Sequence, residues 1–236
     1  MSARYAVYFA PDRHSPWRMF GAHWLGRDEH DNSVLTQPDL AGILPSELAR
    51  FTEEPRRYGF HATLKAPFRL AAGVDESRLV TRLSALALKL KLVPLGPMGV
   101  TQIKNFVALV PINPELAYSP TGLQALAATC VVELDDLRAP LLPAELARRQ
   151  TSPLDSRANE LLDLYGYPYV MERFRLHMTL TGQVDAPLAQ RVMAAVVPEV
   201  ARLNAAAPLW LDRLCLFVES APGAPFHRIL DLKLRA

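Results

Sequence analysis

The chain has 236 residues, of which 50% are hydrophobic and 21% charged, and its formal net charge is +2. This length suits one large or two small globular cores, and the apolar fraction excludes a wholly disordered chain. The near-neutral charge argues against a general nucleic-acid coating protein. No apolar run approaches the roughly 18–20 residues of a membrane span, and the first apolar stretch is too short for a secretory signal.

The two cysteines, Cys130 and Cys215, lie far apart in the sequence, each within an apolar segment. This setting indicates buried free thiols rather than a disulfide or a metal pair. We therefore expect a cytoplasmic protein without disulfides and without a metal site built on sulfur.

The first half of the chain alternates between strand and helix patterns. Pro45 suits the first position of a short helix, and Asp75 is the expected N-cap of an amphipathic helix. The strands are predicted from β-branched and aromatic residues and from period-two alternation. In chain order we expect strand 4–10, helix 45–51, strand 58–68, a helix with apolar residues from 79 to 90, and strands 92–100 and 105–112.

The second half repeats this alternation after a cap and a proline, Ser119 and Pro120. A helix is expected from there to about residue 137, and another begins after Asp185. The remaining expected elements are helices 143–148 and 156–164 and strands 173–182, 209–218 and 228–234.

Both halves thus follow one order of helix, strand, helix, strand and strand, which an internal duplication explains. We expect an α+β molecule with two similar lobes related by an approximate two-fold axis. Each lobe would carry an antiparallel-rich sheet with helices on its outer face, and a cleft would lie between the lobes. We expect a single bilobal domain over residues 1–236, with lobe 1 at about 1–115, lobe 2 at about 116–236 and the boundary near 114–119.

One triplet, His-x-Thr, occurs at a comparable place in each half. The copies are His61-Ala62-Thr63 and His177-Met178-Thr179. Each follows a large apolar residue, Phe60 or Leu176, and each is followed by leucine. Two copies in matching context favour a functional role over ordinary strand composition.

Side chains alternate between the faces of a strand, so residues two apart share a face. On the first strand His61, Thr63 and Lys65 are expected on the polar face. On the second strand the polar face carries Arg175, His177, Thr179 and Thr181. If the two polar faces oppose one another, imidazoles, hydroxyls and cations meet in one cleft.

Such a cleft suits the chemistry of phosphate esters. Imidazole titrates near neutral pH, so one ring can take a proton from a nucleophile while the other gives a proton to the leaving oxygen. Threonine hydroxyls can donate to phosphate oxygens, and Lys65 and Arg175 can offset phosphate charge. Neither motif contains a carboxylate, so no metal or other cofactor is expected.

The paired motifs resemble the 2H phosphoesterase superfamily, which includes 2′-5′ RNA ligase-like proteins and cyclic phosphodiesterases. Its pattern is His, any residue, Thr or Ser, then an apolar residue. The stretches 58–68 and 167–182 look more narrowly like the DUF1045 branch, which is associated with phosphonate metabolism. The resemblance covers essentially the whole chain. It implies that His61 and His177 are the catalytic acid–base pair and that Thr63 and Thr179 bind phosphate.

Seven further residues are candidates for substrate binding, each with a structural alternative. The cations also suit a solvated strand end, and the tyrosines also suit packing in the core or at its rim. These candidates are Lys65, Arg175, Thr181, Tyr58, Tyr167, Tyr169 and Arg173. The long separation of the two histidines also indicates a helical insertion at 139–170 that would wall the cleft.

Our main hypothesis from the sequence is a metal-independent hydrolase, a 2H-type cyclic phosphodiesterase. The resemblance suggests a cyclic ribose phosphate from phosphonate catabolism as its substrate. One alternative is an RNA 2′,3′-cyclic phosphodiesterase or 2′-5′ RNA ligase-like enzyme, and another is a non-catalytic RNA- or nucleotide-binding module. The expected partner is a small phosphorylated substrate or an RNA terminus, with neither a membrane nor an obligate protein partner.

Overall fold

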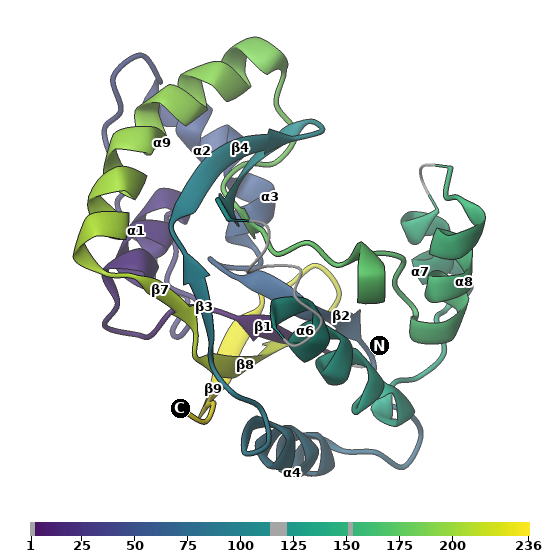
Figure 1. The fold of residues 1–236 in the computed structure, drawn as a ribbon. Coiled ribbons are helices and arrows are strands. Elements are labelled where there is room, and N and C mark those ends of the chain that lie inside the picture. Colours follow the sequence, from purple (N-terminus) through teal and green to yellow (C-terminus); the bar gives the residue numbers. More distant parts are fainter. Residues whose placement is uncertain (1–2, 114–121, 151–152) are drawn as a thin grey trace.

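The computed structural model describes residues 3–113, 122–150 and 153–236 (Figure 1). In these ranges the strands are β1 (Arg4–Phe9), β2 (Ala62–Phe68), β3 (Val93–Gly96), β4 (Met98–Ile103), β5 (Phe106–Pro111), β6 (Met178–Thr179), β7 (Leu209–Leu211), β8 (Arg213–Glu219) and β9 (His227–Lys233). The helices are α1 (Pro16–Leu25), α2 (Pro45–Phe51), α3 (Glu53–Arg56), α4 (Glu76–Ala87), α6 (Leu123–Val132), α7 (Pro143–Arg149), α8 (Ser156–Tyr165) and α9 (Ala186–Ala206). Two 3₁₀ turns are η1 (Asp135–Leu137) and η2 (Met171–Arg173).

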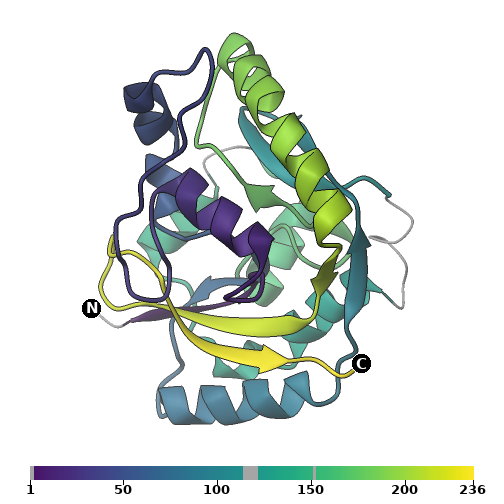
Figure 2. The same cartoon turned by 90° about the vertical axis from the view of Figure 1, so that its left-hand side faces the viewer.

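Antiparallel pairing joins these strands into three sheets, with the orders β2-β1-β8-β9, β3-β7 and β4-β5-β6. Helix α4 packs against β8 and β9, α6 against β2, and α9 against β4 and β5. Figure 2 shows α4 running beneath the four-stranded sheet and α9 lying along β4. The strand that follows each His-x-Thr histidine, β2 or β6, is an edge strand of its sheet. The result is a mixed α/β molecule with antiparallel sheets.

Capping residues start the predicted helices where the sequence places them. The carboxylates of Asp75, Asp155 and Asp185 each accept a hydrogen bond from the backbone N–H three residues later, at 2.8, 2.9 and 2.9 Å. Each bond satisfies one of the donors that a helix leaves unpaired at its N-terminus. The starts of α4, α8 and α9 were therefore predicted correctly.

Helix α1 was not predicted. Ser15 caps it by accepting from the N–H of Trp17 at 3.2 Å, Pro16 occupies its first turn, and Gly26 ends it with a φ of +73°. The helix buries Trp17 and Trp24, and Gly21 lies against the ring of Phe60. Arg18 and His23 interrupt the apolar residues of this helix, and Arg18 is itself buried, so the apolar stripe is hard to recognise from the sequence.

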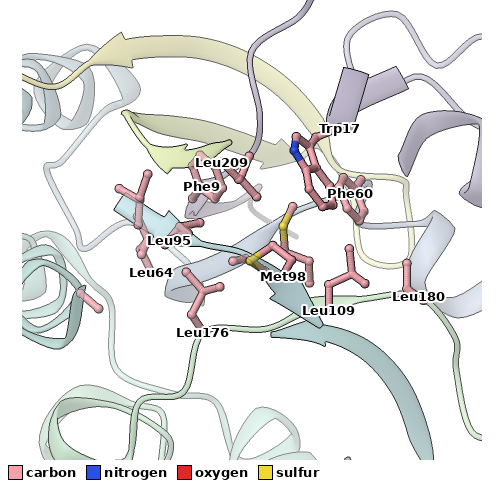
Figure 3. Close-up of a cluster of buried hydrophobic side chains, with 14 of the residues drawn as sticks. Phe9, Trp17, Phe60, Leu64, Leu95, Met98, Leu109, Leu176, Leu180 and Leu209 are labelled. Carbon is pink, nitrogen blue, oxygen red and sulfur yellow. The ribbon is translucent and has the colours of Figure 1, made fainter. Parts of the chain in front are cut away.

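One hydrophobic core joins the sheets. Figure 3 shows Phe9 and Leu64 of the four-stranded sheet, Leu109 of the three-stranded sheet and Leu209 of β7 in one cluster. The odd-numbered residues of β1 enter this core, whereas its even-numbered residues Ala6 and Tyr8 pack on the opposite face. Both cysteines are free and buried, as predicted.

The two motif strands are shorter than predicted. Gly59 has a φ of +79°, a conformation that interrupts an extended strand, so β2 begins only after His61. Strand β6 contains only Met178 and Thr179, and it ends because the Thr181 side chain takes the place of a ladder carbonyl. The Thr181 hydroxyl accepts from the N–H of Val107 at 2.9 Å.

Two other segments also differ from the sequence prediction. The expected strand 92–100 is divided into β3 and β4, which belong to different sheets, because Gly96 has a φ of +66° and Pro97 has no N–H. The long helix expected up to residue 137 ends at Val132 and continues as the 3₁₀ turn η1.

The predicted duplication is not confirmed. Each sheet contains strands from both sides of residue 115; the four-stranded sheet, for example, joins β1 and β2 to β8 and β9. The expected lobe boundary at 114–119, with the cap and proline that follow it at Ser119 and Pro120, lies outside the described residues. The segment 139–170 is largely helical where described, as predicted, and contains α7 and α8.

Within the described ranges, no helix is both long enough and apolar enough to cross a lipid bilayer.

Candidate functional site

A pocket of about 450 Å³ lies between the motif strands. Its walls include His61 and Thr63 at the start of β2 and Thr179 from β6. Strand registers explain this placement: Thr63 pairs with Tyr8 of β1, and Thr179 pairs with Ala108 of β5. The structure therefore brings the two His-x-Thr segments to one pocket, whose size is typical of small-molecule sites at about 300–1,000 Å³.

His61 is held on two sides. Its Nδ1 lies 2.9 Å from the carbonyl oxygen of Gly59, and its ring stacks on Tyr8 at 3.8 Å between centroids. Because a carbonyl only accepts, Nδ1 carries the proton, and Nε2 of the neutral ring is an acceptor. The hydroxyl of Thr63 lies 3.3 Å from this Nε2.

His177 repeats the same local arrangement beside the pocket. Its Nδ1 lies 2.9 Å from the carbonyl oxygen of Arg175, again two residues earlier. The pocket wall next to it is formed by Phe106, whose ring lies 5.7 Å from that of His177. His177 itself is not among the side chains that line the pocket.

Burial sets the charge state of His61. Desolvation lowers its pKa to about 4, the bond to the Gly59 carbonyl raises the pKa, and His177 lowers it further. His61 is therefore neutral at neutral pH.

Three of the seven further candidates line the pocket. Tyr58 and Tyr167 are half-buried there, and Thr181 is fully buried, with its hydroxyl accepting from the N–H of Val107. The ring of Tyr58 stacks on Phe226 at 5.2 Å, so Tyr58 combines a packing role with a place in the wall.

Lys65 is not in the pocket. The register of β1 with β2 shifts by one residue between the pairs Val7–Lys65 and Tyr8–Thr63, so the strict alternation on which its placement depended is broken. Lys65 is 3% exposed, and its ammonium donates to the carbonyl of Val131 at 3.0 Å and pairs with Asp135 at 3.2 Å. Lys65 therefore connects β2 to α6 and to the turn η1 that follows it.

Arg173, Arg175 and Tyr169 also lie outside the pocket wall. Arg173 pairs with Asp155 at 2.8 Å, and Arg175 donates to the carbonyl oxygens of Glu172 and Phe174 at 2.9 and 2.7 Å. Tyr169 is 43% exposed. Residues 174–177 do not form a strand, so the alternation expected for Arg175 does not apply.

The sequence analysis missed several pocket residues, among them Arg4, Tyr8, Glu54 and Arg149. Arg4 and Tyr8 belong to a strand whose even positions face the pocket, a signal that the sequence contained. Arg149 comes from α7 and reaches the wall by hydrogen bonds to the carbonyls of Gly166 and Pro67. Only the fold brings that helix to β2. In the described residues, no group of three or more His, Cys, Asp or Glu side chains is arranged to hold a metal ion.

Comparison with known proteins identifies the family to which the chain belongs. The family model DUF1045, described as a protein of unknown function, matches residues 63–227. This match covers most of the chain, including both His-x-Thr threonines. The chain therefore belongs to the DUF1045 family, as the sequence predicted.

Two curated proteins are similar to the chain along almost its full length. A "Ribose 1,5-bisphosphate phosphokinase PhnN" from Janthinobacterium sp. (strain Marseille) is 40% identical over 226 residues, which are 94% of this chain and 49% of that protein. A protein of the same name from Laribacter hongkongensis (strain HLHK9) is 35% identical over 224 residues, 95% of this chain and 50% of that protein. The chain thus spans about half the length of these relatives.

These names contradict the activity predicted from the sequence. Both relatives are named phosphokinases, which transfer a phosphoryl group, whereas we predicted a hydrolase that opens a cyclic phosphodiester. The prediction failed because imidazole and hydroxyl groups in a pocket indicate phosphate chemistry without defining the phosphoryl acceptor. The matches do not extend to the 2H superfamily, and that part of the resemblance stays a prediction.

Proposed function

We propose that this chain binds a phosphorylated ribose in the pocket that the two His-x-Thr segments share. The observation behind this proposal is that one pocket of about 450 Å³ combines hydroxyl donors, hydrogen-bond acceptors and arginines. A sugar phosphate offers the complementary groups, because its hydroxyls donate and its phosphate accepts.

The acceptors in the pocket suit sugar hydroxyls. His61 is neutral because burial lowers its pKa to about 4, so its Nε2 can accept from a hydroxyl. The carboxylate of Glu54 lies next to Gly182, since a Cβ added at Gly182 would be 3.3 Å from one of its oxygens. A phosphate would be repelled by Glu54 but a ribose hydroxyl would not.

The threonines suit a phosphate oxygen. Thr63 and Thr179 come from different sheets and face the same space. A hydrogen bond from a hydroxyl to a charged oxygen contributes about 1.5–3 kcal/mol. We assign one phosphate to these two hydroxyls.

The names of the two relatives, of which the chain covers about half, fit this class of ligand. A protein that acts on ribose 1,5-bisphosphate must bind a phosphorylated ribose, and this chain would supply such a pocket within phosphonate metabolism. The sequence has no G-x-x-x-x-G-K-S/T segment, the loop that cradles the phosphates of a nucleoside triphosphate in many kinases. We therefore assign phosphosugar binding, and not binding of a phosphoryl donor, to this chain.

Calorimetric titration of the chain with ribose 5-phosphate, ribose and ATP tests the proposal. We expect ribose 5-phosphate to bind and ribose to bind at least about 10-fold more weakly, because the charge-assisted bonds are lost. Thr179→Val should weaken the binding of ribose 5-phosphate by about 10-fold or more. Thr81→Val is the matched control, because Thr81 is exposed on α4 and donates only to the carbonyl of Ser77. Equal affinities for ribose and its phosphate would overturn the proposal.

A further inference from the structure

Helix α1 is connected to both walls of the pocket. His61 and Thr63 line one wall, which we call the first wall, and Thr179 and Thr181 line the second wall. Strands β2 and β6, at which these walls are built, belong to different sheets, so no common strand ladder fixes the distance between them. Helix α1 contacts the residue that precedes His61 and the residue that follows Thr179.

Phe60 connects α1 to the first wall. Gly21 has no side chain, and the Phe60 ring lies directly against the helix at this position, since a Cβ added at Gly21 would be 2.0 Å from Cγ of the ring. The ring of Phe60 is completely buried and lies edge to face with Phe20, at 5.9 Å between centroids. Because Phe60 and His61 are consecutive in the chain, the packing of Phe60 on α1 also places the backbone of His61.

Trp24 connects the same helix to the second wall. Its indole Nε1 donates to the carbonyl oxygen of Leu180 at 2.8 Å. The N–H groups of Leu180 and Thr181 both donate to the Val107 carbonyl, at 2.9 and 3.2 Å. Strand β6 contains two residues. These contacts, rather than a long ladder, therefore hold the second wall in place.

The hydrogen bond from Trp24 is buried. Trp24 is 1% exposed and Leu180 is 0% exposed, so water cannot replace the indole as a donor. A buried carbonyl that loses its donor is costly, and the backbone would move to satisfy it. Thr179 and Thr181 are the neighbours of Leu180 in the chain, so this movement would displace the second wall.

We infer that α1 sets the distance between the two walls, with Gly21 and Trp24 as positioning residues for the binding of a phosphorylated sugar. This inference rests on the proposed function, which assigns one phosphate to Thr63 and Thr179 together. Two hydroxyls reach the same phosphate only within a narrow range of separation, because hydrogen bonds weaken steeply with distance and angle. Neither Gly21 nor Trp24 lines the pocket, so both act through the residues that they contact.

The first test compares Trp24→Phe with Trp17→Phe. Both tryptophans lie on α1, are 1% exposed and donate to a backbone carbonyl, which for Trp17 is that of Ala207 at 2.6 Å. Neither Trp17 nor Ala207 lines the pocket. The two substitutions therefore remove the same kind of bond from the same helix, at the second wall in one variant and at the end of α9 in the other.

Calorimetric titration with ribose 5-phosphate should give an affinity about 3- to 10-fold weaker for Trp24→Phe than for the wild-type chain, the effect expected of one hydrogen bond. Trp17→Phe should bind the sugar phosphate with wild-type affinity. A general loss of stability cannot produce this difference, because the titration is carried out at a temperature at which both variants are folded.

Gly21→Ala tests the first wall. The added methyl group must displace the Phe60 ring, and His61 with it, so the affinity for ribose 5-phosphate should be at least about 3-fold weaker. Gly73→Ala is the control, because a Cβ at Gly73 would meet nothing within 4 Å. Wild-type affinity in a folded Gly21→Ala variant would overturn the role of Gly21. If this variant fails to fold, the two tryptophan variants decide.

Amide hydrogen exchange tests the second wall without a ligand. The N–H groups of Thr181 and Gly182 are both hydrogen-bonded to backbone carbonyls. In Trp24→Phe these two amides should exchange at least about 10-fold faster than in the wild-type chain, because local opening of the wall becomes easier. Trp17→Phe should leave their exchange unchanged.

The outcomes separate this inference from the proposed function. Wild-type affinity for ribose 5-phosphate in Trp24→Phe would overturn the inference. Equal losses of affinity in Trp24→Phe and Trp17→Phe would also overturn it, because the loss would then not depend on contact with the wall. Both results leave the proposed function intact. Failure of the wild-type chain to bind ribose 5-phosphate would overturn the proposed function, and unchanged exchange at Thr181 in Trp24→Phe would overturn the inference whether or not the sugar binds.

Discussion

Each motif histidine keeps its Nδ1 proton by donating to the carbonyl oxygen two residues earlier, at Gly59 for His61 and at Arg175 for His177. The threonine two residues later then faces the pocket. The triplet itself was therefore enough to predict that His61, Thr63 and Thr179 share one pocket, whereas their roles in catalysis and phosphate binding stay predictions. The triplet could not show that His177 would lie beside Phe106 and outside the pocket lining, because that depends on β5.

The buried, neutral state of His61 predicts a pH-dependent stability. In the unfolded chain the histidine takes up a proton below its ordinary pKa of 6.5, whereas the folded chain takes it up only near pH 4. Stability is therefore fully present above pH 6.5 and is lost as the pH falls from 6.5 towards 4, by about 2–3 kcal/mol for this one group. Urea unfolding at several pH values should show that the free energy of unfolding decreases less steeply for His61→Gln than for the wild-type chain as the pH falls.

The control for this titration is His14→Gln, which removes an exposed histidine. As the pH falls from 6.5 towards 4, the stability of His14→Gln should decrease as steeply as that of the wild-type chain. A His61→Gln slope equal to the wild-type slope would contradict the neutral state assigned to His61.

Lys65 and Asp135 form an asymmetric pair. Asp135 is also bonded by Arg138 at 2.9 Å, so it keeps a cation if Lys65 is removed. Lys65 is buried, and if Asp135 is removed it keeps the Val131 carbonyl and the Phe68 ring, whose centre is 5.3 Å away, but no carboxylate. We expect Asp135→Asn to lower the free energy of unfolding by about 3 kcal/mol and Lys65→Met by about 1 kcal/mol or less. Urea unfolding measures both, and ribose 5-phosphate binding should be unchanged in Lys65→Met. Equal losses in the two variants would contradict this account.

At the scale of the elements, caps, prolines and hydrophobic periodicity were reliable guides and strict alternation was not. Asp75, Asp155 and Asp185 start helices where predicted. The bulges in β2 arise from its pairing with β1, and the two-residue length of β6 arises from its pairing with β5. These pairings cannot be predicted from the sequence. Residues whose placement depended on alternation beyond the motif, Lys65 and Arg175, were therefore misplaced.

The turn before β2 is predicted to be sensitive to substitution. Gly59 and Gly73 have nearly equal φ values of +79° and +76°, but a Cβ at Gly59 would lie 2.9 Å from the Cβ of buried Glu29, and one at Gly73 would meet nothing within 4 Å. Gly73→Ala should cost about 1 kcal/mol for the backbone conformation alone. Gly59→Ala should cost about 3 kcal/mol, since Glu29 and its partner Arg228 must also move.

Binding separates this explanation from a general loss of stability. Gly59→Ala should also weaken ribose 5-phosphate binding, because the Gly59 carbonyl orients His61, whereas Gly73→Ala should leave binding unchanged. Unfolding curves and titrations of the same two proteins measure both effects. Equal stabilities and equal affinities for ribose 5-phosphate in the two variants would show that the contact with Glu29 affects neither folding nor binding.

At the scale of the whole molecule, the sheets combine strands from both ends of the sequence. Strand β1 pairs with β2 on one side and with β8 on the other. This arrangement could not be read from the sequence, in which the repeated order of elements suggested two lobes made of consecutive residues. The class of mixed helices and antiparallel strands was predicted, but the partners of each strand were not.

The topology predicts that neither half of the chain folds alone. A fragment of residues 1–115 would lack β8, and a fragment of residues 116–236 would lack β1 and β5, so each would expose an unpaired central strand. Circular dichroism should show no cooperative thermal transition for either fragment and a single one for the whole chain. A fragment that unfolds cooperatively would instead support the division into lobes.

The pairing of β1 with β8 also has a consequence for how the protein is made. The ribosome adds Cys215 about 200 residues after its partner Tyr8, which at about 5–20 residues per second is a delay of roughly 10–40 seconds. During that time strand β1 has no neighbour on this side. Its unpaired backbone groups are therefore open to other partners until β8 is made.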